Sequence, residues 1–121
     1  MPIKKILIVD DSATDRQFLM ETLSSKGYEC VIASNGDEGI AKSKAEQPDL
    51  ILMDIIMPGI DGYKATRTIV RDDATKHIPV IICTGRNQET DRVWGMRQGA
   101  KEFVAKPIDP RELLSKIAAM G

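Results

Sequence analysis

The sequence predicts an α/β fold in which five parallel strands form a doubly wound sheet with helices on both faces. Five short apolar runs alternate along the chain with five amphipathic stretches, which is typical of repeated βα units. The runs are almost continuously apolar, as in ILIV of residues 6–9, and this is expected for strands that are buried on both faces. The 121 residues fit one domain, 1–121.

The boundaries of the elements follow from caps, glycines and prolines. Ser12 can cap the first helix and Gly27 can end it, and Pro110 stands at an early helical position, where its missing N–H costs nothing. The expected strands are residues 5–9, 29–34, 50–53, 79–84 and 102–105. The expected helices are residues 13–26, 37–47, 63–71, 88–98 and 110–120.

Two of these helices have inner faces that the apolar spacing suggests. We expect Phe18, Leu19 and Leu23 of the first helix to face the sheet, and Val93 and Met96 of the fourth.

The same fourth helix contains two residues of special interest. Trp94, the only tryptophan, is either a half-buried packing residue or an anchor for a partner. Gly95 weakens a helix by up to about 1 kcal/mol relative to Ala. We therefore hypothesise that it softens this helix for switching. A Gly95→Ala variant that is more stable but shifts normally on phosphorylation would remove this idea.

Right-handed crossovers between five βα units favour the flavodoxin-like (βα)5 strand order 2-1-3-4-5. In that order the strands at 5–9 and 50–53 are neighbours beside the switch point where such sheets bind ligands. Cys30 and Cys83 would lie three strands apart, about 14 Å, which is too far for a disulfide. We expect two free thiols in a reducing compartment.

The charge balance excludes some partners. Seventeen Lys and Arg residues oppose 18 Asp and Glu residues, so no strong field attracts nucleic acid or an anionic membrane. The apolar part of the N-terminus is too short for a signal peptide or a membrane span. The sequence therefore predicts a cytoplasmic protein that binds neither nucleic acid nor membrane.

Polar side chains follow the strands that should meet at the carboxyl edge of the sheet. They are Asp10, Asp11, Asp54, Thr84 and Lys106. Two carboxylates 4 Å apart repel each other by about 4 kcal/mol at an effective dielectric constant near 20. Lys106 can offset one charge, and oxygen ligands with few carboxylates suit Mg²⁺ (or Mn²⁺) for the rest.

A cation beside a carboxylate also prepares phosphoryl transfer. Asp54 stands alone at the end of the central strand and is the best candidate nucleophile, whereas Asp10 and Asp11 are better placed to hold the metal. Lys106 and Thr84 can hold the remaining phosphoryl oxygens.

These residues resemble the receiver domain of two-component response regulators. The matching motifs are IVDDS at Ile8–Ser12, LMDIIMPGIDG at Leu52–Gly62, Thr84 after the fourth strand and the pair Lys106-Pro107. The match covers essentially the whole chain in register.

The resemblance implies roles for individual residues. Asp54 would be phosphorylated by a sensor histidine kinase or its phosphotransfer domain. Asp11, Asp54 and the backbone carbonyl of Ile56 would bind Mg²⁺, and Asp10 would support the metal. Four further implications concern the phosphoryl group and its surroundings. Lys106 would contact this group, Thr84 would move toward it, Phe103 would turn inward with Thr84, and the bond before Pro107 would be cis.

Within this family, the segment Gln88–Gly95 followed by Arg97–Ala100 resembles single-domain regulators of type IV pilus twitching motility and chemotaxis. A chain of this length suggests no output domain, so a downstream protein would bind the face formed by 88–98, 102–105 and 110–120. We expect a monomer or weak dimer that catalyses only its own phosphoryl transfer and dephosphorylation.

Other functions fit less well. Aspartate-nucleophile phosphatases carry a second Asp two positions after the first. In this chain, the residue two positions after Asp54 is Ile56, and the residue two positions after Asp10 is Ser12. A flavin or dinucleotide-binding module is disfavoured because the chain has no GxGxxG motif after its first strand. A phosphorylation-independent scaffold and a phosphate sink for a sibling regulator remain alternatives.

Overall fold

In residues 2–120, which the computed structural model describes, five parallel strands form one sheet in the order β2-β1-β3-β4-β5. This order confirms the flavodoxin-like prediction. The strands are β1 Lys5–Val9, β2 Glu29–Ala33, β3 Leu50–Met53, β4 Val80–Thr84 and β5 Glu102–Ala105. The helices are α1 Ala13–Ser24, α2 Gly36–Glu46, α3 Gly62–Arg71, α4 Glu89–Arg97 and α5 Pro110–Met120.

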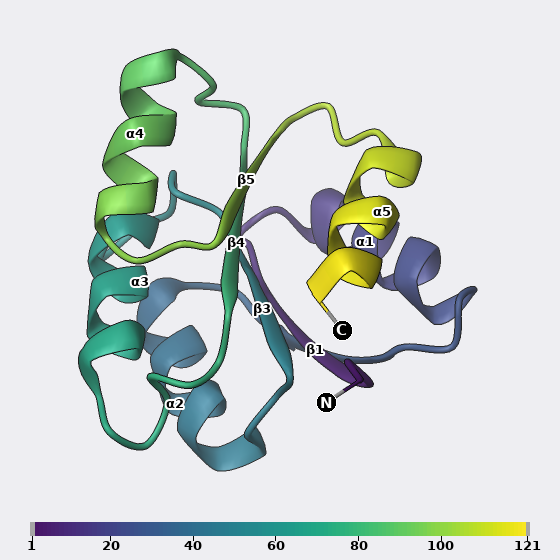
Figure 1. The fold of residues 1–121 in the computed structure, drawn as a ribbon, viewed down its shortest axis with the longest axis horizontal. Coiled ribbons are helices and arrows are strands. Elements are labelled where there is room, and N and C mark those ends of the chain that lie inside the picture. Colours follow the sequence, from purple (N-terminus) through teal and green to yellow (C-terminus); the bar gives the residue numbers. More distant parts are fainter. Residues whose placement is uncertain (1, 121) are drawn as a thin grey trace.

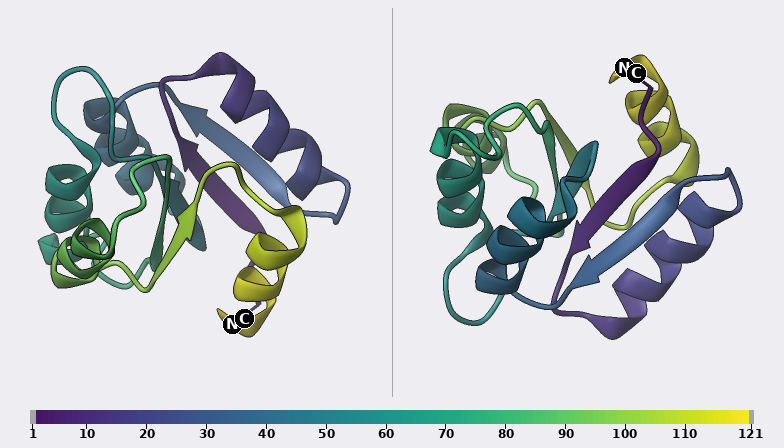
Figure 2. Two further views of the ribbon diagram at one scale, coloured as in Figure 1. Left: turned by 90° about the horizontal axis from the view of Figure 1, so that it is seen from above. Right: turned by 90° about the horizontal axis from the view of Figure 1, so that it is seen from below.

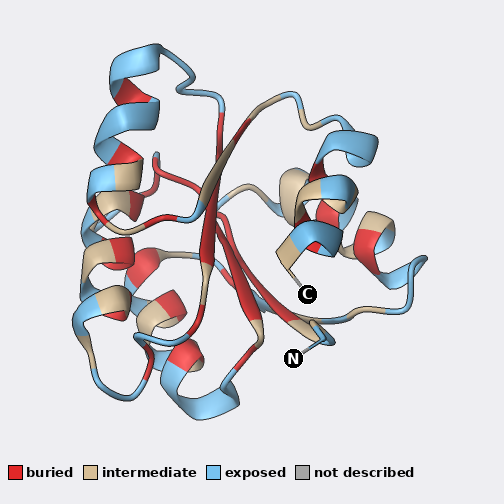
Figure 3. Ribbon diagram, in the orientation of Figure 1, coloured by how far each residue is buried: buried red, intermediate tan, exposed pale blue. Residues whose placement is uncertain are grey.

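The helices form two layers around the sheet, with α1 and α5 on one face and α2, α3 and α4 on the other (Figures 1 and 2). Successive residues of a strand point to opposite faces, so Ile6 and Ile8 pack in the cluster that contains Leu19 and Leu23 of α1. The intervening residues of β1 pack toward α3 with Ile69 and its neighbours. The inner strands β1, β3 and β4 are therefore buried on both faces (Figure 3), whereas the edge strands β2 and β5 are only partly buried.

The register of the sheet brings the carboxyl ends of β1 and β3 together. Val9 lies opposite Met53, and the Asp54 backbone N–H donates to the Val9 carbonyl at 2.9 Å. The Asp10 N–H donates to the carbonyl of Ala33 at 3.1 Å. Asp10 and Asp54 therefore directly follow two adjacent strands at the same edge of the sheet.

Two predictions about helix faces were wrong. Phe18 is 41% exposed, because it lies one residue, or about 100° of rotation, away from the buried Leu19. Val93 is 40% exposed, because the inner face of α4 is formed by Asp91 and Gly95, four residues apart. The remaining expectations for these helices, burial of Leu19, Leu23 and the partly buried Met96, are confirmed.

Gly95 has a packing role that the sequence did not indicate. There is no room for a Cβ atom at this position without displacing Ile82 of β4. In Gly95→Ala the expected gain in helix propensity is therefore opposed by the cost of displacing the buried Ile82 side chain.

Trp94 is 47% exposed and its ring meets that of Tyr63 edge to face, with centroids 6.4 Å apart. Cys30 and Cys83 are free thiols, as predicted, and burial raises the pKa of Cys83 to about 12. Across the described residues, no helix combines the length and the apolar composition needed to cross a bilayer.

Candidate functional site

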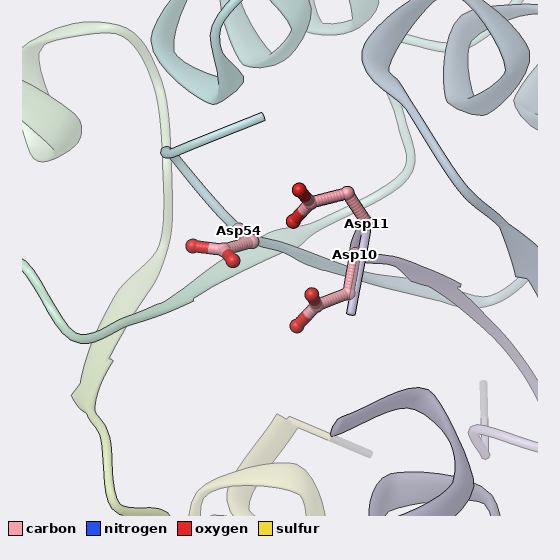
Figure 4. A group of neighbouring side chains, drawn as sticks. All are labelled: Asp10, Asp11 and Asp54. Carbon is pink, nitrogen blue, oxygen red and sulfur yellow. The ribbon is translucent and has the colours of Figure 1, made fainter. Parts of the chain in front are cut away.

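Three carboxylates meet at the carboxyl edge of the sheet. One oxygen each from Asp10, Asp11 and Asp54 lies within 4.8 Å of the other two (Figure 4). Asp10 and Asp54 are buried, whereas Asp11 is exposed at the start of the loop after β1. The sequence prediction that these three side chains converge is confirmed.

Lys106 enters the same site from the end of β5. Its Nζ lies 2.7 Å from Asp10 Oδ2 and 3.2 Å from Asp54 Oδ2. It also lies 2.8 Å from Asp15 Oδ2, a contact that was not expected. The side chain of Lys106 is 16% exposed, so these ion pairs are shielded from most of the solvent.

The burial and the ion pairs change the acidity of these groups. Burial raises the pKa of Asp10 above its usual value, although hydrogen bonds from Lys106 and from the Ser12 N–H oppose this effect. Burial by itself lowers the pKa of Lys106, but the hydrogen bonds to Asp10 and Asp15 and the charge of Asp54 outweigh it, so the net pKa is raised. Lys106 therefore stays protonated at neutral pH.

The two oxygens of Asp54 have different surroundings. Oδ1 accepts the backbone N–H of Ile55 at 2.7 Å and that of Ile56 at 3.4 Å. Oδ2 accepts one hydrogen bond, from Lys106. The backbone bonds fix the carboxylate and leave Oδ2 as the oxygen with more free lone-pair capacity.

The other residues that the sequence singled out lie around this cluster. Thr84 ends β4 and is fully buried, and its Oγ1 accepts the backbone N–H of Arg86 at 3.3 Å. Phe103 of β5 is partly buried beside Ile82. Ile56, two residues after Asp54, is 60% exposed.

The peptide bond between Lys106 and Pro107 is cis, as the resemblance implied. It lies in the loop between β5 and α5. A cavity of about 310 Å³ opens beside it, lined on the α1 side by Asp15 and Phe18.

Sequence reasoning missed Asp15, because it considered only residues at strand ends. Asp15 stands in the first turn of α1, where its N–H bonds the capping oxygen of Ser12. The available signal was its position: the first turn of a helix that starts at the carboxyl edge of the sheet places side chains over that edge.

It also missed a second polar network, on the α4 side. Arg86 Nε lies 2.8 Å from Asp91 Oδ1, and the Tyr63 hydroxyl donates to the same carboxylate oxygen at 3.2 Å. The Gln88 N–H donates to Asp91 Oδ2 at 3.2 Å, which completes a capping box at the start of α4. Asp91 thus joins the loop after β4 to α3 and α4, and the exposed, charged pattern of the sequence gave no reason to expect its burial.

The chemistry of the donor set suits a hard divalent cation. Asp10, Asp11 and Asp54 carry three negative charges within 4.8 Å of one another, and Asp15 adds a fourth beside Lys106. Lys106 is the one ammonium that contacts them among the described residues. The remaining negative charge and the all-oxygen donors match the preference of Mg²⁺ or Mn²⁺.

Comparison with known proteins places this geometry in context. The model of the response regulator receiver domain family matches residues 6–118. The chain is similar to Protein PilH of Pseudomonas aeruginosa, with 48% identity over 116 residues that cover 96% of each chain. It is 38% identical over 117 residues to the phosphate regulon transcriptional regulatory protein PhoB of the same organism. These residues are 97% of this chain but 51% of that longer relative.

A solved structure is also similar over nearly the whole chain. It is a chain of the CheX–CheY–BeF3–Mg²⁺ complex from Borrelia burgdorferi, with a TM-score of 0.91 and 29% identity. The match covers 97% of this chain and 88% of that one.

Proposed function

The chain belongs to the response regulator receiver domain family, and from this premise we propose that it accepts a phosphoryl group on Asp54 and signals by changing its contacts with other proteins. The phosphoryl donor in this proposal is a sensor histidine kinase or its phosphotransfer domain. The supporting observation is that Asp54 Oδ2, Lys106 Nζ and the carboxylates of Asp10 and Asp11 meet at one edge of the sheet.

The proposed metal is Mg²⁺, with Mn²⁺ as a substitute. Asp11, Asp54 and the backbone carbonyl of Ile56 would hold it, and Asp10 would support it from its buried position. When bound, the cation neutralises phosphoryl oxygens and aligns the donor. The excess of carboxylates over ammonium groups supports this assignment.

In the proposed reaction, Asp54 Oδ2 attacks phosphorus and the leaving group departs on the opposite side. The backbone N–H groups of Ile55 and Ile56 keep the carboxylate oriented through Oδ1. Lys106, which stays protonated, compensates charge on the phosphoryl oxygens. The Thr84 hydroxyl exchanges its bond with the Arg86 N–H for a bond to a phosphoryl oxygen.

The phosphoryl group adds a charge of about −1.5 to −2 and new hydrogen-bond acceptors at this edge. We propose that contacts with Thr84 and Lys106 favour one of two arrangements of α4 and β5, and that Phe103 turns inward in the favoured one. The output surface would be formed by α4, β5 and α5. The exposed Trp94 supports α4 as part of a binding surface.

The proposed pathway is of the motility or chemotaxis type, because Gln88–Gly95 and Arg97–Ala100 resemble single-domain regulators of that type. The protein would act in the cytoplasm as a monomer or weak dimer. It would have no catalytic turnover beyond its own phosphoryl transfer and dephosphorylation, and it would bind neither nucleic acid nor membrane.

The test is phosphorylation in vitro. Acetyl phosphate with Mg²⁺ should add one phosphoryl group to the wild-type protein, as measured by intact-protein mass spectrometry. Asp54→Asn should remain unlabelled, and a chelator should prevent labelling of the wild type. The matched control is Asp37→Asn, which removes an exposed carboxylate in the first turn of α2 and should label normally. Undiminished labelling of Asp54→Asn would refute the assignment.

Two alternatives predict different results. A phosphorylation-independent scaffold would capture the same partners whether or not Asp54 is phosphorylated. A phosphate sink would be labelled and would draw phosphoryl groups from a shared kinase, but its capture of downstream partners would not change. Affinity capture with and without beryllofluoride, which mimics the phosphoryl group, distinguishes both from the proposed switch.

A further inference from the structure

Lys106 is held by three carboxylates that come from three different elements. Its Nζ lies 2.7 Å from Asp10 Oδ2, 2.8 Å from Asp15 Oδ2 and 3.2 Å from Asp54 Oδ2. An ammonium group has three N–H donors and no acceptor. Each donor therefore has one carboxylate, and the longest of the three contacts is the one to Asp54.

The position of Lys106 matters for the oxygen that would react. Asp54 Oδ1 already accepts two backbone N–H groups, so Oδ2 is the freer oxygen. An ammonium that closes onto Oδ2 would form a stronger charge-assisted bond there and occupy lone-pair density needed for attack. The shorter contacts to Asp10 and Asp15 keep the hydrogen bond to that oxygen at 3.2 Å, the longest of the three.

We propose that Asp15 is a positioning residue for phosphoryl transfer: by sharing the Lys106 ammonium, it keeps the hydrogen bond from Lys106 to Asp54 Oδ2 long, so that this oxygen retains lone-pair capacity for attack. This inference rests on the proposed function of Asp54. Asp10 also binds the ammonium, at 2.7 Å from the end of β1, whereas Asp15 binds it at 2.8 Å from the first turn of α1. The side chain of Asp15 is 43% exposed, so it contributes by orienting Lys106 more than by burial.

With acetyl phosphate as the donor, the phosphoryl group is transferred from acetate to Asp54. The new P–O bond to Asp54 forms as the P–O bond to acetate breaks, and acetate leaves with the electron pair. Lys106 remains protonated throughout. Loss of Asp15 frees one N–H of Lys106, and Asp54 Oδ2 is the nearby acceptor that it can approach.

A purely structural role makes a different prediction. A carboxylate in the first turn of a helix is favoured by the helix dipole, so Asp15 could serve α1 alone. In that case Asp15→Asn would lower the stability of the protein without changing the rate of phosphorylation or the surroundings of Lys106.

The first experiment compares the rates of phosphorylation by acetyl phosphate and Mg²⁺ over a range of donor concentrations. Asp15→Asn should lower the maximal rate by about fivefold, the factor that corresponds to weakening one hydrogen bond to a charged group. Asp15→Glu, which keeps the charge, should recover most of the rate. Asp37→Asn, which removes a first-turn carboxylate from α2 instead of α1, should match the wild type.

The second experiment does not depend on phosphorylation or metal. Nuclear magnetic resonance of the metal-free protein, with the lysine side-chain nitrogen labelled, should detect the ammonium signal of Lys106 because its protons are held by three acceptors. This signal should be lost through faster proton exchange in Asp15→Asn and retained in Asp37→Asn.

The outcomes separate this inference from the proposed function. If the wild type is not labelled, the proposed function fails and the inference fails with it. If the wild type is labelled and Asp15→Asn is labelled at the same rate or faster, only the positioning role is refuted. Retention of the Lys106 ammonium signal in Asp15→Asn would refute it as well.

Discussion

Gly95 of α4 lies so close to Ile82 of β4 that a Cβ atom at position 95 would be 2.6 Å from Ile82 Cδ1. Ile82 is fully buried and belongs to the cluster that also contains Phe103. A side chain at position 95 would therefore have to displace Ile82 or move α4 away from the sheet.

This contact predicts that Gly95→Ala lowers the free energy of unfolding by about 1–3 kcal/mol, because overpacking outweighs the gain in helix propensity. Chemical denaturation measures the change. Ile82→Val removes the Cδ1 atom, so the double variant Gly95→Ala/Ile82→Val should be more stable than the two single changes added together predict. Simple additivity of the two changes would show that this contact does not limit the packing of α4.

Asp11 should destabilise the protein when no metal is bound. Its carboxylate lies within 4.8 Å of those of Asp10 and Asp54, and like charges at such distances repel each other. Because Asp11 is exposed and screened by solvent, we expect Asp11→Asn to raise the free energy of unfolding in the presence of a chelator by about 1 kcal/mol. Thermal denaturation measures it.

Millimolar Mg²⁺ should reverse this order, since a ligand that binds only the folded state stabilises it by an amount that grows with the logarithm of its concentration relative to Kd. The wild type should gain stability from Mg²⁺, and Asp11→Asn should gain little. Asp73→Asn, which removes an acid that is 93% exposed, is the control and should gain as much as the wild type. An equal gain by Asp11→Asn would exclude Asp11 as a metal ligand.

Asp49 should contribute to stability in a pH-dependent manner. Its Oδ2 accepts the backbone N–H groups of Lys4 and Lys5, each at 2.9 Å, and these bonds, that of Lys5 foremost, lower the pKa of Asp49 below its usual 3.8. A carboxylate whose pKa is lowered in the folded state stabilises the fold above the unfolded-state pKa. This contribution disappears as pH falls through the lower, folded-state value.

We therefore expect Asp49→Asn to be less stable than the wild type near neutral pH by up to about 1 kcal/mol, because neutral hydrogen bonds replace charge-assisted ones. The difference should close below about pH 4 as the wild-type carboxylate is protonated. Urea denaturation at several pH values tests this, with Asp73→Asn as the control. A difference that stays constant from neutral to acid pH would contradict the role given to the Asp49 charge.

Arg86 should stabilise the start of α4 more than an ordinary surface arginine does. Its partner Asp91 has a side chain that is 11% exposed, and Tyr63 donates to the same oxygen. Arg86→Gln should lower the free energy of unfolding by about 1 kcal/mol, because a mostly buried carboxylate loses its cation.

The matched control is Arg92→Gln, on α4 itself. Arg92 pairs with Glu89, and both side chains are more than half exposed, so its loss should change stability by less than about 0.5 kcal/mol. Equal effects of the two substitutions, measured by chemical denaturation, would show that Asp91 is adequately solvated without Arg86.

The sequence by itself determined the strands, their order and the carboxylate cluster. Continuous apolar runs that alternate with amphipathic stretches indicate strands buried between two layers of helices, and right-handed βα crossovers then favour an order in which these strand ends meet. Asp10, Asp11, Asp54 and Lys106 follow those strand ends directly, so their convergence follows from the fold class.

Only the tertiary structure decided the contacts that depend on the distance and rotation of a helix over the sheet. Asp15 meets Lys106, 91 positions away along the chain, because the first turn of α1 reaches over the strand edge. Val93 faces solvent and Gly95 faces Ile82 because α4 is turned with Asp91 inward. Apolar periodicity could not show this rotation, because the residues that α4 buries are an aspartate and a glycine, and neither contributes to a hydrophobic pattern.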